Sequence, residues 1–395
     1  MDYRLQDDMK SALESVEKVG KRNALFHEKP FNAVAYQKLE EAVDEAEAEI
    51  DSLNASNDYE ELAIEDMRYN VEVIGEFASF YRRESEKTVP EMVDLMYGEG
   101  AFDHIKSDAR DFDEKAEYEA MRMSQEWVID DPGKYRDELV PKLHSITRAV
   151  ENYAKEEGLM PDEFEFETQV IPPNRTQRAH WNPQIGQLNM PVETGFTVIR
   201  ENGALNIDAT NAIFTEFHEL VGHGVHQHNS EALNYPKFSE DTRYRPSSMA
   251  HCEGVSQHRE ELAEDFIREN FDDLPVLEMG LERRGLGRNT GKERAVFGSL
   301  TREMMQREEI DREEAIDQIA PLYGSESDEG VDVAELALEN NDMSLKEAFR
   351  EACYSAGRML TERVDADSVS TEALTTGQWT PQVLPDAVEF FNSRS

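Results

Sequence analysis

The segment NAIFTEFHELVGHG, residues 211–224, decides how the rest of the chain is interpreted. Its apolar residues recur from Ile213 to Val221 at spacings of i, i+4, i+7 and i+8, which predicts a helix with one buried stripe. The same segment carries two of the ten histidines, His218 and His223, and a glutamate directly follows the first. We therefore expect a helix that buries one side and presents ionisable groups on another.

The spacing of the two histidines constrains the shape of that helix. Five residues advance a regular α-helix by about 500°, which leaves the imidazoles of His218 and His223 about 140° apart. An i→i+5 hydrogen bond or an equivalent bulge within 217–224 brings them together, and such π-bulges favour functional sites. Gly222 lowers the backbone cost of the distortion. We predict that imidazole nitrogens of the two histidines converge to within about 3–4 Å of each other, with a Glu253 carboxylate oxygen at similar range. Glu219 should point into the same space without being a ligand.

The clustering of histidines indicates a metal site. Six of the ten lie between residues 218 and 258, and imidazole with carboxylate suits Zn²⁺. Glu253, at the start of the next predicted helix, is the favoured third ligand because it needs no longer loop between the helices. Glu260 and Glu261 are the alternatives, and Glu260 shares a face with Glu253, from which it can orient the histidine ligands.

The motif HELVGHG at 218–224 is similar at all but one position to the H-E-L-L-G-H-G motif of the dipeptidyl peptidase III family. In that family the two histidines bind zinc and the glutamate is the general base. The resemblance implies the roles of ligand for His218 and His223 and of base for Glu219. It covers this helix alone.

The sequence after this motif resembles other peptidases of the zincin class, and the resemblance is to the gluzincins within that class. GHGVH at 222–226 and EGVSQ at 253–257 are similar to segments of thimet-type oligopeptidases, and the order of motifs is similar to the carboxypeptidase Taq family. An uncharacterised bacterial family with H-E-x-x-P-G-H-H, then E-G-W-A and a C-terminal Y-x-x-G, has the same order. Its last element is comparable with Tyr354 to Gly357. These resemblances imply a helical, zincin-like fold.

Periodicity along the chain predicts a mainly α (α+β) protein. Alternation from Phe164 to Val170 indicates a strand, and FTVIRENGALNID at 196–208 indicates a hairpin that turns at Asn202-Gly203. We expect a small antiparallel sheet beside the active-site helix and one continuous two-lobed unit. Its regions are an N-terminal helical region at 1–158 and a catalytic region at 159–395, comprising a sheet at 162–208, zinc helices at 211–270 and C-terminal helices at 274–395.

The charge of the chain restricts its environment. It has 85 acidic and 41 basic residues, 14 of them lysine, and a net charge of −44. An evenly acidic, lysine-poor surface suits concentrated salt, which screens the self-repulsion, so we expect a salt-adapted (halophilic) protein. The acidic surface also argues against nucleic acid and anionic membranes as partners, because both bind basic patches. The chain has only two cysteines, Cys252 and Cys353, which fits a reducing compartment. It shows no signal pattern and no long apolar run, and together these features favour a cytoplasmic location.

The function that these patterns predict is a zinc-dependent peptidase acting on peptide substrates. Zinc activates a water molecule, Glu219 is the general base, and Tyr354 or His258 is the candidate donor to the oxyanion. The strand at 204–208 is a candidate for binding an extended peptide by strand addition. The alternatives are a zinc hydrolase of non-peptide amides or esters and a protein that binds the metal without catalysis.

Overall fold

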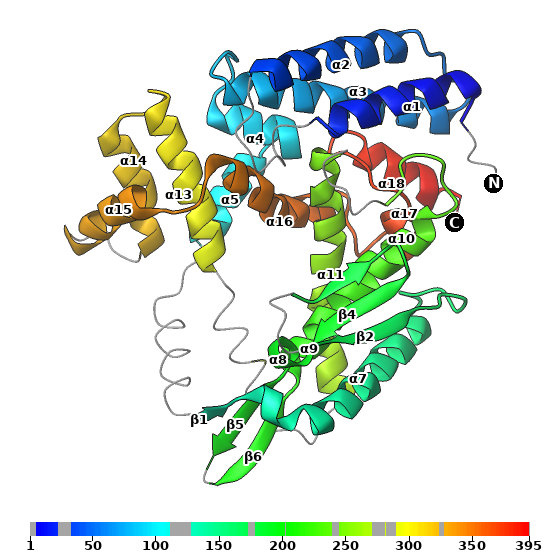
Figure 1. Cartoon of the computed structure of the whole chain (residues 1–395), viewed down its shortest axis with the longest axis vertical. Helices are drawn as coiled ribbons and strands as arrows, with labels where there is room; N and C mark the ends of the chain where they lie inside the picture. Colours follow the sequence, from blue (N-terminus) through cyan, green and yellow to red (C-terminus); the bar gives the residue numbers. More distant parts are fainter. Residues whose placement is uncertain are drawn as a thin grey trace. The chain divides into compact units, whose positions relative to one another are not determined.

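The protein is mainly α-helical with two small sheets, as its computed structural model shows in Figure 1. The structure describes the residues 5–22, 33–110, 128–172, 178–201, 203–238, 245–270, 281, 290–323 and 328–394. The mainly α (α+β) class expected from the sequence is thereby confirmed. Parts of the expected C-terminal helical region, 274–280 and 282–289, lie outside the described residues.

The chain divides into two compact units, and each is made of separated stretches of sequence. Unit 1 comprises residues 1–112, 230–254 and 289–395, and unit 2 comprises residues 113–229 and 255–288. This division does not follow the predicted boundary at residue 158, because the chain enters unit 2 before that point and leaves it again. Periodicity reports local structure and carries no information on which distant helices pack together.

Unit 1 is helical throughout its described residues. Its elements are α1 (Asp7–Gly20), α2 (Ala33–Asp51), α3 (Asp58–Tyr81), α4 (Val89–Tyr97), α5 (Ala101–Arg110), η4 (Pro246–Ser248), the start of α11 (Met249–Asn270), α13 (Thr290–Gln306), α14 (Arg312–Ile319), η5 (Ala320–Tyr323), α15 (Asp328–Asn340), α16 (Leu345–Arg363), α17 (Thr371–Thr375) and α18 (Leu384–Asn392). One continuous cluster of buried apolar residues packs α1–α5 against α13–α18.

Unit 2 contains both sheets. The first has the antiparallel order β1–β5–β6 (Figure 1). The second has the order β2–β4–β3. The elements of the unit are β1 (Val128–Asp130), η2 (Pro132–Tyr135), α7 (Arg136–Glu156), β2 (Glu167–Ile171), β3 (His180–Asn182), β4 (Gln187–Pro191), α8 (Val192–Gly195), β5 (Thr197–Glu201), β6 (Ala204–Asp208), α9 (Thr210–Glu216), η3 (Phe217–Gly224), α10 (Val225–Ser230) and the rest of α11.

The strands agree only partly with the expectation of one antiparallel sheet at 162–208. The hairpin is present as β5 and β6, and Gly203 has a φ of +83°, which glycine adopts without strain. Asn202 lies outside the described residues. However, β2 pairs parallel with β4, and β1 comes from the region expected to be helical. Three residues are too few to show a period-2 pattern, so β1 could not be recognised.

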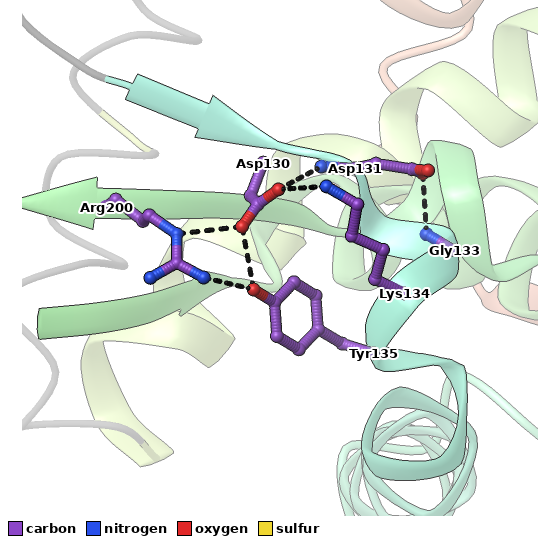
Figure 2. A network of polar contacts seen from close by, with 6 residues as sticks. All are labelled: Asp130, Asp131, Gly133, Lys134, Tyr135 and Arg200. Atoms are coloured by element: carbon purple, nitrogen blue, oxygen red, sulfur yellow. Dashed lines mark hydrogen bonds and ion pairs between the residues drawn. The ribbon is translucent and has the colours of Figure 1, made fainter.

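A polar cluster fixes β1 to β5 (Figure 2). The Asp130 carboxylate accepts hydrogen bonds from Lys134 Nζ at 2.8 Å, Tyr135 Oη at 2.7 Å and Arg200 Nε at 2.8 Å. Arg200 also donates to Tyr135 Oη. The hydrogen bonds from Lys134, Tyr135 and Arg200 hold the pKa of Asp130 well below its usual range, so the cluster stabilises the ionised carboxylate.

None of the described helices is long and apolar enough to cross a membrane.

Candidate metal centre

The segment that carries both histidines of the motif is a π-helix. It spans Phe217–Gly224, between α9 and α10. The predicted distortion within 217–224 is therefore confirmed. The imidazole rings of His218 and His223 have centroids 4.9 Å apart and an interplanar angle of 86°. The extra residue in the turn thus brings two side chains together that a regular helix would hold on different faces.

Aromatic packing holds the start of the π-helix. Phe217 is fully buried, and its ring centroid lies 6.0 Å from that of Tyr153 on α7 and 5.5 Å from that of Phe266 on α11. Tyr153 and Phe266 are 5.1 Å apart, which completes a trio of contacting rings. The residue before His218 is therefore anchored to two helices of unit 2.

A buried acid lies directly before this anchor. Glu216 is fully buried, and Thr147 Oγ1 on α7 donates to its Oε1 at 2.7 Å. Burial raises the pKa of Glu216 to about 8, so the carboxyl is largely protonated at neutral pH. A neutral Glu216 joins α9 to α7 without placing a further negative charge inside the unit.

Close contact with α11 positions the middle of the π-helix. A Cβ at Gly222 would lie 2.5 Å from Ser256 Oγ and 2.7 Å from Ser256 Cα, so only glycine permits this approach. Gly222 is therefore required for packing between helices, in addition to any backbone freedom that the sequence suggested.

Residues of α11 hold the Nδ1 atom of each histidine. His218 Nδ1 lies 2.7 Å from Glu260 Oε1, and His223 Nδ1 lies 3.0 Å from Ser256 Oγ. A carboxylate only accepts hydrogen bonds, so the neutral His218 ring carries its proton on Nδ1 and has its lone pair on Nε2. In the same tautomer, His223 would donate its Nδ1–H to Ser256 Oγ. Contacts of this kind orient histidine ligands in known metal sites.

Glu253 meets the two histidines. One ligand atom of each of His218, His223 and Glu253 lies within 4.8 Å of the others. Within the described residues this is the one such group of three or more His, Cys, Asp or Glu side chains. The division between the units falls after Gly254, which lies inside α11. Glu253 and Ser256 lie on either side of this division, but both belong to the one continuous helix α11.

Of the three candidates for the third ligand, the geometry favours Glu253. Glu260 contacts His218 on Nδ1, the position of an orienting group. Glu261 has its carboxylate 3.9 Å from His258 Nδ1 instead.

His258 lies on a different side of α11 from the residues that meet the histidines. Glu253, Ser256 and Glu260 follow one another at i, i+3 and i+7, whereas His258 is two residues, about 200°, beyond Ser256. This position on the helix makes His258 the less suitable of the two proposed oxyanion donors.

Tyr354 belongs to α16 in unit 1, close to a tight helix crossing. A Cβ at Gly254 would lie 2.3 Å from the carbonyl oxygen of Gly357, and a Cβ at Gly357 would lie 2.6 Å from that of Ala250. Glu253 directly precedes Gly254 on α11, and Tyr354 lies one turn before Gly357 on α16. The Lys292 ammonium lies 3.7 Å from the centroid of the Tyr354 ring.

Glu219 is oriented by a strand that the sequence analysis did not single out. The backbone N–H of Trp181, on the edge strand β3, donates to Glu219 Oε2 at 2.8 Å. The Trp181 indole in turn donates to Gln227 on α10 at 2.5 Å. A main-chain donor leaves no signature in the sequence, which is why this contact could not be predicted. The strands β3 and β4 both contact η3.

A pocket adjoins this group within unit 2. It has a volume of about 310 Å³, and His218, Glu219 and Glu260 form part of its wall together with Arg178. A larger hollow of about 640 Å³ lies on unit 1 around α3, but its lining includes no histidine or cysteine. The smaller pocket is therefore the better candidate for a reaction site.

Comparison with known proteins adds little to this geometry. No protein-family model matches the chain, and no curated protein matches it. One solved structure, described as the putative lipoprotein from Colwellia psychrerythraea, is similar with 12% sequence identity and a TM-score of 0.39. The match covers 100% of this chain and 57% of that one, so the chain spans little more than half the length of its structural neighbour.

Proposed function

We propose that the protein is a zinc-dependent peptidase whose metal ligands are His218, His223 and Glu253. The observation that carries the proposal is the π-helix at Phe217–Gly224, which brings ligand atoms of the three side chains within 4.8 Å of one another. The π-helix occurs at the point where the two histidines must converge. Because π-helical turns are rare and are frequent at functional sites, this position favours a functional cause over helix packing alone.

The donor set fits zinc. Two imidazole nitrogens and one carboxylate are the protein ligands of many catalytic zinc sites, which keep a further position open. The hydrogen bonds to Glu260 and Ser256 leave Nε2 of each histidine as the ligand atom. When bound there, zinc supplies a water of lowered pKa and polarises the carbonyl that is attacked.

The residues of the chain would perform the remaining steps. Glu219, held by the Trp181 N–H, would take a proton from the attacking water and deliver it to the leaving amine. Tyr354 remains our candidate for the donor to the developing oxyanion, because its helix crosses α11 one residue beyond Glu253. The pocket of about 310 Å³ would receive the substrate next to these groups.

The substrate class and the cellular setting belong to the same proposal. The excess of acids that gives the net charge of −44 supports action in concentrated salt and opposes binding to nucleic acid. We propose peptides as substrates and a cytoplasmic location.

A digest of a peptide library in molar KCl, read by mass spectrometry, tests the proposal when wild-type protein is compared with Glu219→Gln. We expect the wild-type protein to contain one zinc and to cleave peptides, and the variant to keep the metal and lose most turnover, because only proton transfer is removed. Zinc without cleavage of peptides, but with cleavage of simple esters or amides, would favour a non-peptide hydrolase. Bound zinc with no hydrolysis of any of these substrates would indicate that the protein binds the metal without catalysis.

A further inference from the structure

The pocket beside the candidate metal centre contains an arginine, Arg178. Its described lining includes the carboxylates of Glu219 and Glu260 and the hydroxyl and amide groups of Thr194, Asn211 and Thr215, and among these described residues Arg178 supplies the one guanidinium. In a chain with 85 acidic and 41 basic residues, a cation at this position calls for an explanation.

Arg178 has no acidic partner among the residues that the structure describes. Both carboxylates of the pocket have other contacts, since Glu260 meets His218 and Glu219 accepts from the Trp181 N–H. Arg178 is exposed, and its side chain makes neither a hydrogen bond nor an ion pair with the same described residues. A guanidinium without a partner offers a planar fork of donors that matches a carboxylate in a bidentate manner.

The backbone of Arg178 is tied to the same strand that orients Glu219. The Arg178 carbonyl oxygen lies 3.1 Å from His180 Nδ1, at the start of β3, and His180 Nε2 lies 3.3 Å from Asn189 Nδ2 on β4. The next residue of β3, Trp181, donates its N–H to Glu219. The backbone of Arg178 and the carboxylate of the candidate base therefore both contact this three-residue strand.

We propose that Arg178 binds a carboxylate of the substrate and so determines which peptides are cleaved. This inference rests on the proposed peptidase function and extends it to a substrate class. The carboxylate is either the C-terminus of the peptide or an acidic side chain near the scissile bond. A pocket of about 310 Å³ lies at the lower end of the range for small-ligand sites, which suits a short portion of the substrate.

The test compares wild-type protein, Arg178→Gln and a control, Arg148→Gln. Arg148 is an exposed arginine on α7 of the same unit, and it does not line the pocket. Three peptides of one cleaved sequence are used: a neutral peptide with a free C-terminus, its C-terminal amide, and the amide with one acidic side chain. KM and kcat are measured at the lowest KCl concentration that preserves the fold, because salt screens the contact.

We expect Arg178→Gln to raise KM about 10- to 100-fold for one carboxylate-bearing peptide, as loss of a charge-assisted hydrogen bond predicts. Its kcat should change little, and the neutral amide should not respond. The peptide that responds identifies the source of the carboxylate. Arg148→Gln should behave as wild type with all three peptides.

A binding measurement separates this inference from the proposed function. Dissociation constants of the three peptides are measured by calorimetry with Glu219→Gln and with the double variant Glu219→Gln/Arg178→Gln. The inference is overturned if wild-type protein cleaves peptides but Arg178→Gln leaves KM and the dissociation constants unchanged, or weakens all three peptides equally. If wild-type protein cleaves no peptide, the proposed function itself fails, and the inference fails with it.

Discussion

Gly222 of the π-helix faces Ser256 of α11 so closely that no side chain fits between them. A Cβ at Gly222 would come within 2.5 Å of Ser256 Oγ, and this same hydroxyl lies 3.0 Å from His223 Nδ1. The glycine therefore controls both the spacing of the two helices and the orientation of one proposed ligand. The contact links the packing of unit 2 directly to its candidate chemistry.

Replacement of Gly222 by alanine should separate η3 from α11. We expect Gly222→Ala to lower the free energy of unfolding by about 1–3 kcal/mol, as overpacking does elsewhere, and to weaken zinc binding through the loss of the Ser256 contact. Chemical unfolding and zinc titration measure the two effects.

Gly75→Ala is the matched control, because a Cβ at this helical position of α3 would meet Val43 at an ordinary 3.4 Å. It should leave zinc affinity unchanged and should stabilise slightly or have no effect. Equal effects of the two substitutions would contradict the role given to Gly222.

The contact between Glu260 and His218 should control affinity for the metal without supplying a ligand. Glu260→Gln keeps the shape of the side chain but removes the charge that favours the Nδ1–H tautomer of His218. We expect zinc affinity to fall about 10- to 100-fold while the stoichiometry at saturating zinc stays at one.

The control for this variant is Glu264→Gln, an exposed residue one turn further along α11 that pairs with Arg268. It should not change the affinity. A complete loss of zinc from Glu260→Gln at saturating metal would instead assign Glu260 as a ligand.

The polar cluster around Asp130 should make the folding stability of the protein depend on pH. Because the pKa of Asp130 is lowered in the folded protein, its contribution is fully present above the unfolded value of about 4 and is lost as the pH falls through the folded value. Asp130→Asn should therefore lower the melting temperature at pH 7, and the difference from wild type should shrink below about pH 4.

Melting curves between pH 7 and pH 3 at constant high salt test this dependence. Asp162→Asn, which changes an exposed aspartate of the same unit, should show no such dependence. A difference between Asp130→Asn and wild type that stays constant with pH would refute the electrostatic role of the cluster.

The net charge of −44 predicts a fold that requires salt. At low ionic strength the acidic surface repels itself, and at molar salt the screening length falls to about 3 Å. We expect helical circular dichroism to be lost on dialysis to low salt and regained in KCl. An equal melting temperature in 0.1 M and 3 M KCl would refute the salt-adapted interpretation.

The sequence predicted those features that one local pattern determines. The spacing of His218 and His223 required a π-turn, and the helix contains it. Glu253 could be chosen from loop length alone, and it meets the histidines.

Features that depend on contacts between distant segments were predicted poorly. The parallel pairing of β2 with β4, the short strand β1 and the approach of Gly222 to Ser256 all arise from tertiary packing. The contact of Trp181 with Glu219 and the proposed role of Arg178 could not be predicted for a related reason. A backbone donor and one arginine among 27 gain importance only from what lies beside them.

The most direct test of the account is an anomalous-difference electron-density map, recorded at the zinc absorption edge from crystals of the zinc-treated protein. We predict one strong peak, at about 2.0–2.2 Å from Nε2 of His218, Nε2 of His223 and a carboxylate oxygen of Glu253, with Glu219 beside it but not bonded. A map without a peak at the π-helix, or a peak bound by Glu219 instead of Glu253, would contradict the account.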